Sequence, residues 1–125
     1  MTYLKSHKEL IVWQKSVQLT KEIFLLTDKF PKSELYGIIS QMKRASVSIP
    51  SNIAEGYGRK STKEYSQFYS ISYGSALELE TQIIICKELQ FAEKEDYNKV
   101  DLFLDEVLRM LNSMTFQMKK LAARS

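Results

Sequence analysis

The residues best suited to chemistry lie between positions 41 and 63 of this 125-residue chain. If that stretch is helical, four polar side chains at i, i+4, i+7 and i+11 share one face. They are Arg44, Ser48, Ser51 and Glu55. Such a stripe could line a ligand or RNA groove, or it could form an ion-pair network between subunits that reaches Glu78 or Glu80. We favour the network, because buried charges are normally paired.

A cluster of basic and aromatic residues follows the stripe. Its bases are Arg59, Lys60 and Lys63, and its rings are Tyr57, Tyr65 and Tyr69. This mixture suits RNA, since cations neutralise phosphates and rings stack on unpaired bases. Tyr65 and Tyr69 also lie on an apolar helical stripe, which favours a core position for both. For the three bases, an RNA contact and a solvated helix N-terminus both stay open, although cations there oppose the helix dipole.

Other kinds of site have little support in the sequence. His7 is the only histidine, so neither a di-iron Glu-x-x-His pair nor a zinc cluster can form. Cys86 lies on a packing stripe and is best interpreted as a small buried hydrophobe, not as a nucleophile. Gly56-x-Gly58 indicates a helix-ending turn, since no strand precedes it. We therefore expect no enzyme, no metal, no cofactor and no small-molecule substrate.

The composition indicates a single helical domain over residues 1–125. Apolar residues make up 44% and charged residues 26%, and four Gly with two Pro favour helices. A net charge of +3 is too small to imply nucleic-acid binding by itself. The chain has no hydrophobic signal core and no apolar run of about 20 residues. We therefore expect a cytoplasmic protein with no membrane contact.

Hydrophobic periodicity predicts four helices over residues 8–29, 34–55, 61–90 and 93–121, and hence an all-α, antiparallel up-down four-helix bundle. The first apolar seam is Val12, Ser16, Leu19, Ile23, Leu26 and Phe30. The second is Leu35, Ile38, Met42, Ala45, Ile49 and Ile53. The fourth is Tyr97, Val100, Leu104, Val107, Leu111, Met114, Met118 and Leu121. A line through Trp13 widens the first seam beyond one neighbour, so something further should cover that ring.

Proline, glycine and capping residues determine where the helices are expected to end and begin. The second helix continues through Pro50, which removes one backbone hydrogen bond and crowds the Ser46 carbonyl. It should end at Gly56-Tyr57-Gly58 through a glycine in the left-handed conformation. Ser61 followed by Glu64 predicts a capping box for the third helix.

Several segments carry a family resemblance. They are QMKRASVSIPSNIAEGYGRKS at 41–61, LIVWQKS at 10–16, Phe30-Pro31-x-x-Glu34 and GSALELETQ at 74–82. Together they resemble the four-helix-bundle proteins encoded in intervening sequences of bacterial 23S ribosomal RNA genes. The resemblance implies a left-handed bundle in a ring, a homopentamer, with structured RNA or a nucleoprotein as partner and no catalysis. A similar fold occurs in the accessory protein of diversity-generating retroelements. This chain departs from the pattern at Gln90-Phe91-Ala92, where relatives carry Gly and a polar cap.

Two hypotheses for the function follow. In the first, a non-enzymatic oligomer binds RNA through a basic surface, and five copies at +3 would carry +15. That surface comprises Lys43, Arg44, Arg59, Lys60 and Lys63. In the second, an adaptor ring docks a protein partner through apolar flanks of the first and third helices. The expected subunit interface comprises Trp13, Arg44, Ser48, Asn52, Glu55, Tyr69 and Tyr73.

Overall fold

The computed structural model describes residues 5–124, and over that range the chain is all-α with no strand. Its α-helices are α1 (Ile11–Thr27), α2 (Ile38–Tyr57), α3 (Thr62–Glu88) and α4 (Asn98–Arg124). Three short 3-10 helices precede α1, α2 and α4: η1 (His7–Glu9), η2 (Lys32–Glu34) and η3 (Lys94–Tyr97). The predictions of an all-α chain and of four helices are confirmed. All four helices begin later than expected, because a 3-10 turn or a cap occupies their first residues.

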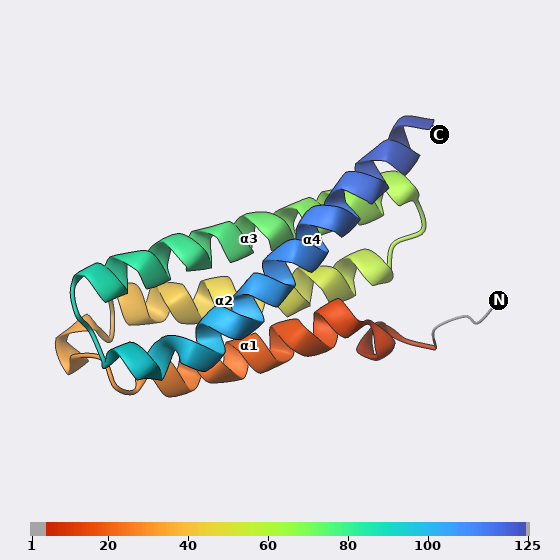
Figure 1. Cartoon of the computed structure of the whole chain (residues 1–125). Helices are drawn as coiled ribbons and strands as arrows, with labels where there is room; N and C mark the ends of the chain where they lie inside the picture. The colour runs from red at the N-terminus through yellow and green to blue at the C-terminus, as the bar shows by residue number, and fades with distance from the viewer. Residues whose placement is uncertain (1–4, 125) are drawn as a thin grey trace.

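The four helices pack around one core (Figure 1). Helices α1 and α3 each contact both α2 and α4. The α1–α2 and α3–α4 connections lie at one end of the bundle, whereas the α2–α3 connection and the end of α4 lie at the other. Residues 58–61 and the last turns of α4, far apart in the sequence, therefore belong to the same end of the molecule.

The predicted apolar seams form the core, with corrections at their ends. The first seam is buried throughout. In the second, Leu35 is 46% exposed and Ile39 is buried, whereas Ile38 is only half-buried. The assignment of Leu35 to the core was wrong because α2 begins at Ile38, so the 3-10 turn before it does not share the helical phase.

In the fourth seam, the buried position changes towards the end of α4. Its first five members, Tyr97 to Leu111, are buried, but Met114 and Met118 are half-buried and Leu121 is 47% exposed. Thr115 is buried near that end of the helix. A strict seven-residue repeat drifts by about 20° per heptad on a straight α-helix, so the core-facing position moves from Met114 to Thr115. The prediction that Leu121 packs in the core was wrong for this reason.

The left-handed residues occur at a different turn from the one expected. Helix α2 ends at Gly58 with φ −78°, and no glycine in residues 5–124 has a positive φ. The expectation of a left-handed glycine after α2 was wrong, because the Gly58 N–H still bonds the Ala54 and Glu55 carbonyls at 3.3 and 3.2 Å. Gln90 and Ala92 instead have φ 60° and 65°.

Gln90 closes α3 in a Schellman motif. The Phe91 N–H bonds the Cys86 carbonyl and the Gln90 N–H bonds the Lys87 carbonyl, both at 3.0 Å. The Phe91 ring then lies 5.6 Å from the Phe30 ring, centroid to centroid, and its carbonyl accepts from the Tyr97 hydroxyl. The loop at which the sequence departs from the family pattern is thus fixed by hydrogen bonds and aromatic packing.

Helix α2 continues through Pro50, as predicted. Proline has no N–H for the carbonyl four residues earlier, which is that of Ser46. The Thr20 hydroxyl of α1 lies 2.9 Å from this carbonyl and 3.0 Å from the Ser16 carbonyl of its own helix, so its one hydrogen is shared between the two acceptors. Helix α1 therefore supplies the hydrogen bond that the proline removes.

Candidate nucleic-acid interface

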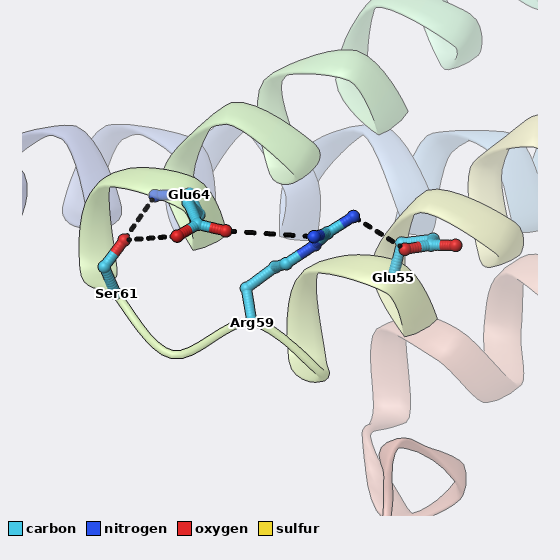
Figure 2. A network of polar contacts seen from close by, with 4 residues as sticks. All are labelled: Glu55, Arg59, Ser61 and Glu64. Carbon is cyan, nitrogen blue, oxygen red and sulfur yellow. Dashed lines mark hydrogen bonds and ion pairs between the residues drawn. The ribbon is translucent and has the colours of Figure 1, made fainter.

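Arg59 is held inside the α2–α3 turn by two carboxylates (Figure 2). Its Nη2 lies 3.2 Å from Glu55 Oε2, and its Nη1 lies 3.9 Å from Glu64 Oε2. The guanidinium also lies 4.8 Å from the centroid of the Phe68 ring. These contacts partly offset the charge of Arg59 and link the end of α2 to the start of α3 across the turn.

The start of α3 presents the other two bases of the turn to solvent. The Ser61 hydroxyl accepts the Glu64 N–H at 3.2 Å, which confirms Ser61 as the N-cap, and it lies 3.3 Å from Glu64 Oε1 (Figure 2). Lys60 and Lys63 flank this cap and are exposed. Glu64 therefore contacts both Ser61 and Arg59, while the two lysines remain available to a polyanion.

Lys43 and Arg44 do not join this turn. They lie on α2 14 and 13 residues before its end at Tyr57, which corresponds to about 20 Å along the helix. The Lys43 ammonium lies 4.8 Å from the centroid of the Phe24 ring, beside the α1–α2 groove. Arg44 is exposed about 100° further round the helix. The five predicted bases therefore form two groups on different parts of the surface.

The polar stripe of α2 joins α2 to α3 within one chain. The Ser48 and Ser75 hydroxyls lie 2.9 Å apart, and the Asn52 amide donates to the Ser48 carbonyl and hydroxyl at 2.8 and 3.0 Å. Within residues 5–124 no ion pair joins Arg44 to the acids of α3. Glu55 is paired with Arg59 within the same chain. An ion-pair network along this stripe would therefore have to join different subunits, and it stays a prediction.

The aromatic residues of the predicted interface differ in accessibility. Trp13 and Tyr73 are half-buried, and the His7 ring of η1 packs edge-on against Trp13 at 5.1 Å between centroids. His7 is thus one cover for Trp13. Tyr69 is fully buried and stacks on Tyr65 at 5.0 Å. Tyr69 offers no surface to a second subunit and is corrected to a core residue; its burial raises the pKa of the phenol.

Three bases near the end of α4 were not included in the predicted site. Lys119, Lys120 and Arg124 are exposed. Helices α3 and α4 have 27 residues each, so the last turns of α4 reach the level of the α2–α3 turn (Figure 1). The sequence contains one indication of this basic segment, which is that no acidic residue follows Glu106. Only the fold shows that these bases and the turn share one end of the bundle.

We define the basic end of the bundle as residues 55–64 together with residues 113–124. The first segment has three bases and two acids, and the second has three bases and no acid. The basic end therefore carries a net charge of +4. Because the whole chain carries +3, the remaining residues carry a net −1. Positive charge is thus concentrated at one end, as a polyanion-binding surface requires.

Within residues 5–124, no cluster of side chains is suited to bind a metal ion, and Cys86 is buried. Residues 5–124 contain no group of three or more His, Cys, Asp or Glu side chains that could hold a metal ion. Cys86 is buried with its sulfur 3.7 Å from that of Met42. Burial, with a smaller effect from Glu34, raises the pKa of its thiol to about 11.

Within residues 5–124, no helix has both the length and the apolar character needed to cross a membrane.

Comparison with known proteins agrees with the resemblance noted in the sequence. The model of the 23S rRNA-intervening sequence protein family matches residues 8–113, from η1 into the second half of α4. No curated protein matches the chain. The match covers the polar stripe and the α2–α3 turn and stops before the last bases of α4. The chain therefore belongs to the family of 23S rRNA-intervening sequence proteins.

Proposed function

We propose that this protein is a non-enzymatic, homo-oligomeric bundle that binds structured RNA or a ribonucleoprotein through its basic end. The observation that carries the proposal is the net +4 at that end against −1 elsewhere. Lys60, Lys63, Lys119 and Lys120 are exposed there, and none of them forms an ion pair within residues 5–124. The family description refers to 23S rRNA, which favours RNA over other polyanions.

The oligomer is part of this proposal. We infer a left-handed, antiparallel up-down bundle that assembles as a cytoplasmic ring, a homopentamer by resemblance. Support comes from the connections at alternate ends of the bundle and from exposed polar and half-buried aromatic surface on α1, α2 and α3. A ring would repeat the basic end once per subunit, and repeated weak contacts bind a polyanion by avidity. The remaining interface residues are Trp13, Arg44, Ser48, Asn52, Glu55 and Tyr73.

Reversing charge at the turn tests the RNA proposal. We expect Lys60→Glu/Lys63→Glu to weaken binding of a fluorescein-labelled RNA hairpin at least tenfold at low salt, and to reduce the salt slope by about 2, since each lysine meets about one phosphate. Fluorescence anisotropy across a salt series measures both quantities, and light scattering reports the particle mass. Arg59 is left in place because it pairs with Glu55 and Glu64, so its replacement would also change contacts within the turn.

The matched control carries the same change of charge at the opposite end. Lys32→Glu/Lys99→Glu alters two exposed lysines near the α1–α2 and α3–α4 connections, and it should leave hairpin affinity within about twofold of the original. Equal losses in both variants would show that net charge alone attracts RNA. A native protein that binds no RNA at low salt would overturn the proposal.

A second function has one specific observation in its favour. An apolar groove of about 510 Å³ runs between α1 and α2, and its lining includes Val17, Phe24, Val47 and Pro50. Val17 and Phe24 are each 40% exposed and Val47 is 43% exposed. An adaptor that docks a protein partner would use this groove rather than the flanks near Trp13 and Tyr73. Its complex would tolerate salt and would be lost in Val17→Asp/Val47→Asp.

A further inference from the structure

The outer face of α4 carries an exposed aromatic ring among basic and amide side chains. Helix α4 turns Val100, Leu104, Val107, Leu111 and Thr115 toward the bundle. The opposite face presents residues at i, i+3, i+7 and i+11, all of them exposed. They are Arg109, Asn112, Phe116 and Lys120, of which Arg109 forms an ion pair with Asp105 at 2.6 Å. Phe116 is 69% exposed, and it lies three and four residues before Lys119 and Lys120.

Packing within the chain does not account for Phe116. Leu111 and Thr115 occupy the neighbouring core-facing positions, so the ring points away from the apolar interior. A single exposed apolar side chain is common on protein surfaces, so the surroundings must decide its meaning. Asn112, Ser113 and Gln117 lie within about one turn, and no acid follows Glu106 in the helix. Phe116 is thus a lone ring on a polar surface of positive charge.

These surroundings favour nucleic acid over other partners. The centre of a protein interface is apolar and depleted in lysine, whereas this face has one ring beside two lysines. A helix that lies on a membrane presents a continuous apolar stripe, which the outer face of α4 lacks. Unpaired bases stack on aromatic rings while lysines neutralise the adjoining phosphates, and amide side chains can bond base edges.

We propose that the outer face of α4 binds unpaired nucleotides of an RNA strand, with a base stacked on Phe116 and phosphates held by Lys119 and Lys120. The inference rests on the proposed RNA-binding function and adds a preference for single-stranded segments. Bases in a duplex are stacked on one another and do not offer a free face to the ring. Phe116 and these lysines also lie beyond residues 8–113, so the site would be a property of this chain rather than of the family match.

The test compares single-stranded and duplex RNA. Phe116→Leu keeps an apolar side chain but removes the aromatic face, and we expect it to weaken binding of a labelled 12-nucleotide single strand about tenfold. Binding of a blunt duplex should stay within twofold. Phe116→Trp should retain the single-strand affinity, and its fluorescence should be quenched by RNA beyond the change seen for Trp13 alone.

Tyr36→Leu is the matched control, because Tyr36 is 93% exposed in the α1–α2 connection at the other end of the bundle. It should leave single-strand binding unchanged. The inference fails if Phe116→Leu binds the single strand as before, if it weakens duplex equally, or if Tyr36→Leu causes the same loss. It also fails if Phe116→Leu lowers the particle mass, since the face would then be a subunit interface. Loss of hairpin binding in Lys60→Glu/Lys63→Glu with none in Phe116→Leu would keep the proposed function and remove only this site.

Discussion

Gly56 shows how one residue sets the distance between two helices. It is buried near the end of α2, where a Cβ atom would lie 2.9 Å from the Cβ of Phe68 on α3. Real Cβ atoms essentially never approach one another so closely, and an atom attached directly to backbone cannot swing aside. The absence of a side chain at Gly56 therefore brings α3 close to α2 and keeps Phe68 beneath the Arg59 guanidinium.

Gly56→Ala should destabilise the protein by roughly 1–3 kcal/mol, because the added methyl forces the two helices apart. Gly58→Ala is its matched control two residues later. There a Cβ meets only carbonyl oxygens at 3.6 and 3.9 Å, and φ is −78°, so stability should stay the same or rise by about 0.5 kcal/mol. Urea unfolding followed by circular dichroism measures both changes. Equal stability of the two variants would contradict the close approach.

For the polar residues of the candidate site, the sequence predicted a shared helix face but not the bonding partners. The period of α2 predicted that Arg44, Ser48 and Glu55 share a face, but not which of them bond within the chain. In the structure, Ser48 forms a hydrogen bond with Ser75 on α3, and Glu55 forms an ion pair with Arg59 in the turn. Partners across helices depend on register and packing, which the sequence does not display.

At the scale of helices, the ends were harder to predict than the middles. The seam of α1 was recovered in full, because burial repeats with the helical period over several turns. The starts of α2 and α4 were placed too early, since a 3-10 turn has the same kinds of residues as a first helical turn. The left-handed residue after α3 was missed because glycine is its usual signal and this chain has Gln90 there.

Gln90→Gly should stabilise the protein by about 1 kcal/mol, because a residue with a side chain is strained at φ 60° whereas glycine is not. The exposed Gln90 side chain makes little contact, so little is lost with it. Gln90→Ala is the control: it removes the amide group but keeps the Cβ, and it should give no such gain. The midpoint of thermal unfolding distinguishes the two variants. A gain in Gln90→Ala equal to that in Gln90→Gly would contradict the role of φ.

At the scale of the whole molecule, the fold reveals a surface that no segment shows alone. Arg59 and Lys119 are 60 positions apart in sequence, so a scan along the chain treats their neighbourhoods separately. They share an end of the bundle only because α3 and α4 have equal length and the chain reverses between them. The helices themselves could be predicted from local periodicity, whereas the basic end could not.

The opposite end carries a partly exposed ion pair, from which we expect a small pH dependence of stability. The Nζ atom of Lys29, just after α1, lies 2.6 Å from Asp96 Oδ1 in η3. Asp96 Oδ2 accepts a hydrogen bond from the Glu93 N–H at 2.9 Å. The hydrogen bond from Lys29, then that from Glu93, lowers the pKa of Asp96 below its ordinary value of 3.8. A lowered folded-state pKa gives a contribution that is present above pH 3.8 and is lost as pH falls through the folded value.

Asp96→Asn should therefore lower the free energy of unfolding at pH 7, and the difference from the original protein should shrink below pH 4. Urea midpoints at pH 7, 5 and 3 measure this change. Glu95→Gln is the control, because Glu95 is exposed and forms no ion pair within residues 5–124. A difference for Asp96→Asn that is constant between pH 7 and pH 3 would show that the carboxylate charge is not its cause.

The hydrogen bond from Thr20 to the Ser46 carbonyl links the middle of α2 to α1. Pro50 leaves that carbonyl without its usual partner, and the replacement donor lies 26 positions earlier in the chain. The middle of α2 is consequently complete only when α1 has docked beside it. Because α1 emerges first during synthesis, the donor is already present when α2 forms, whereas a fragment that begins after α1 would lack it. The proline thus leaves the middle of α2 with a carbonyl whose replacement donor comes from α1.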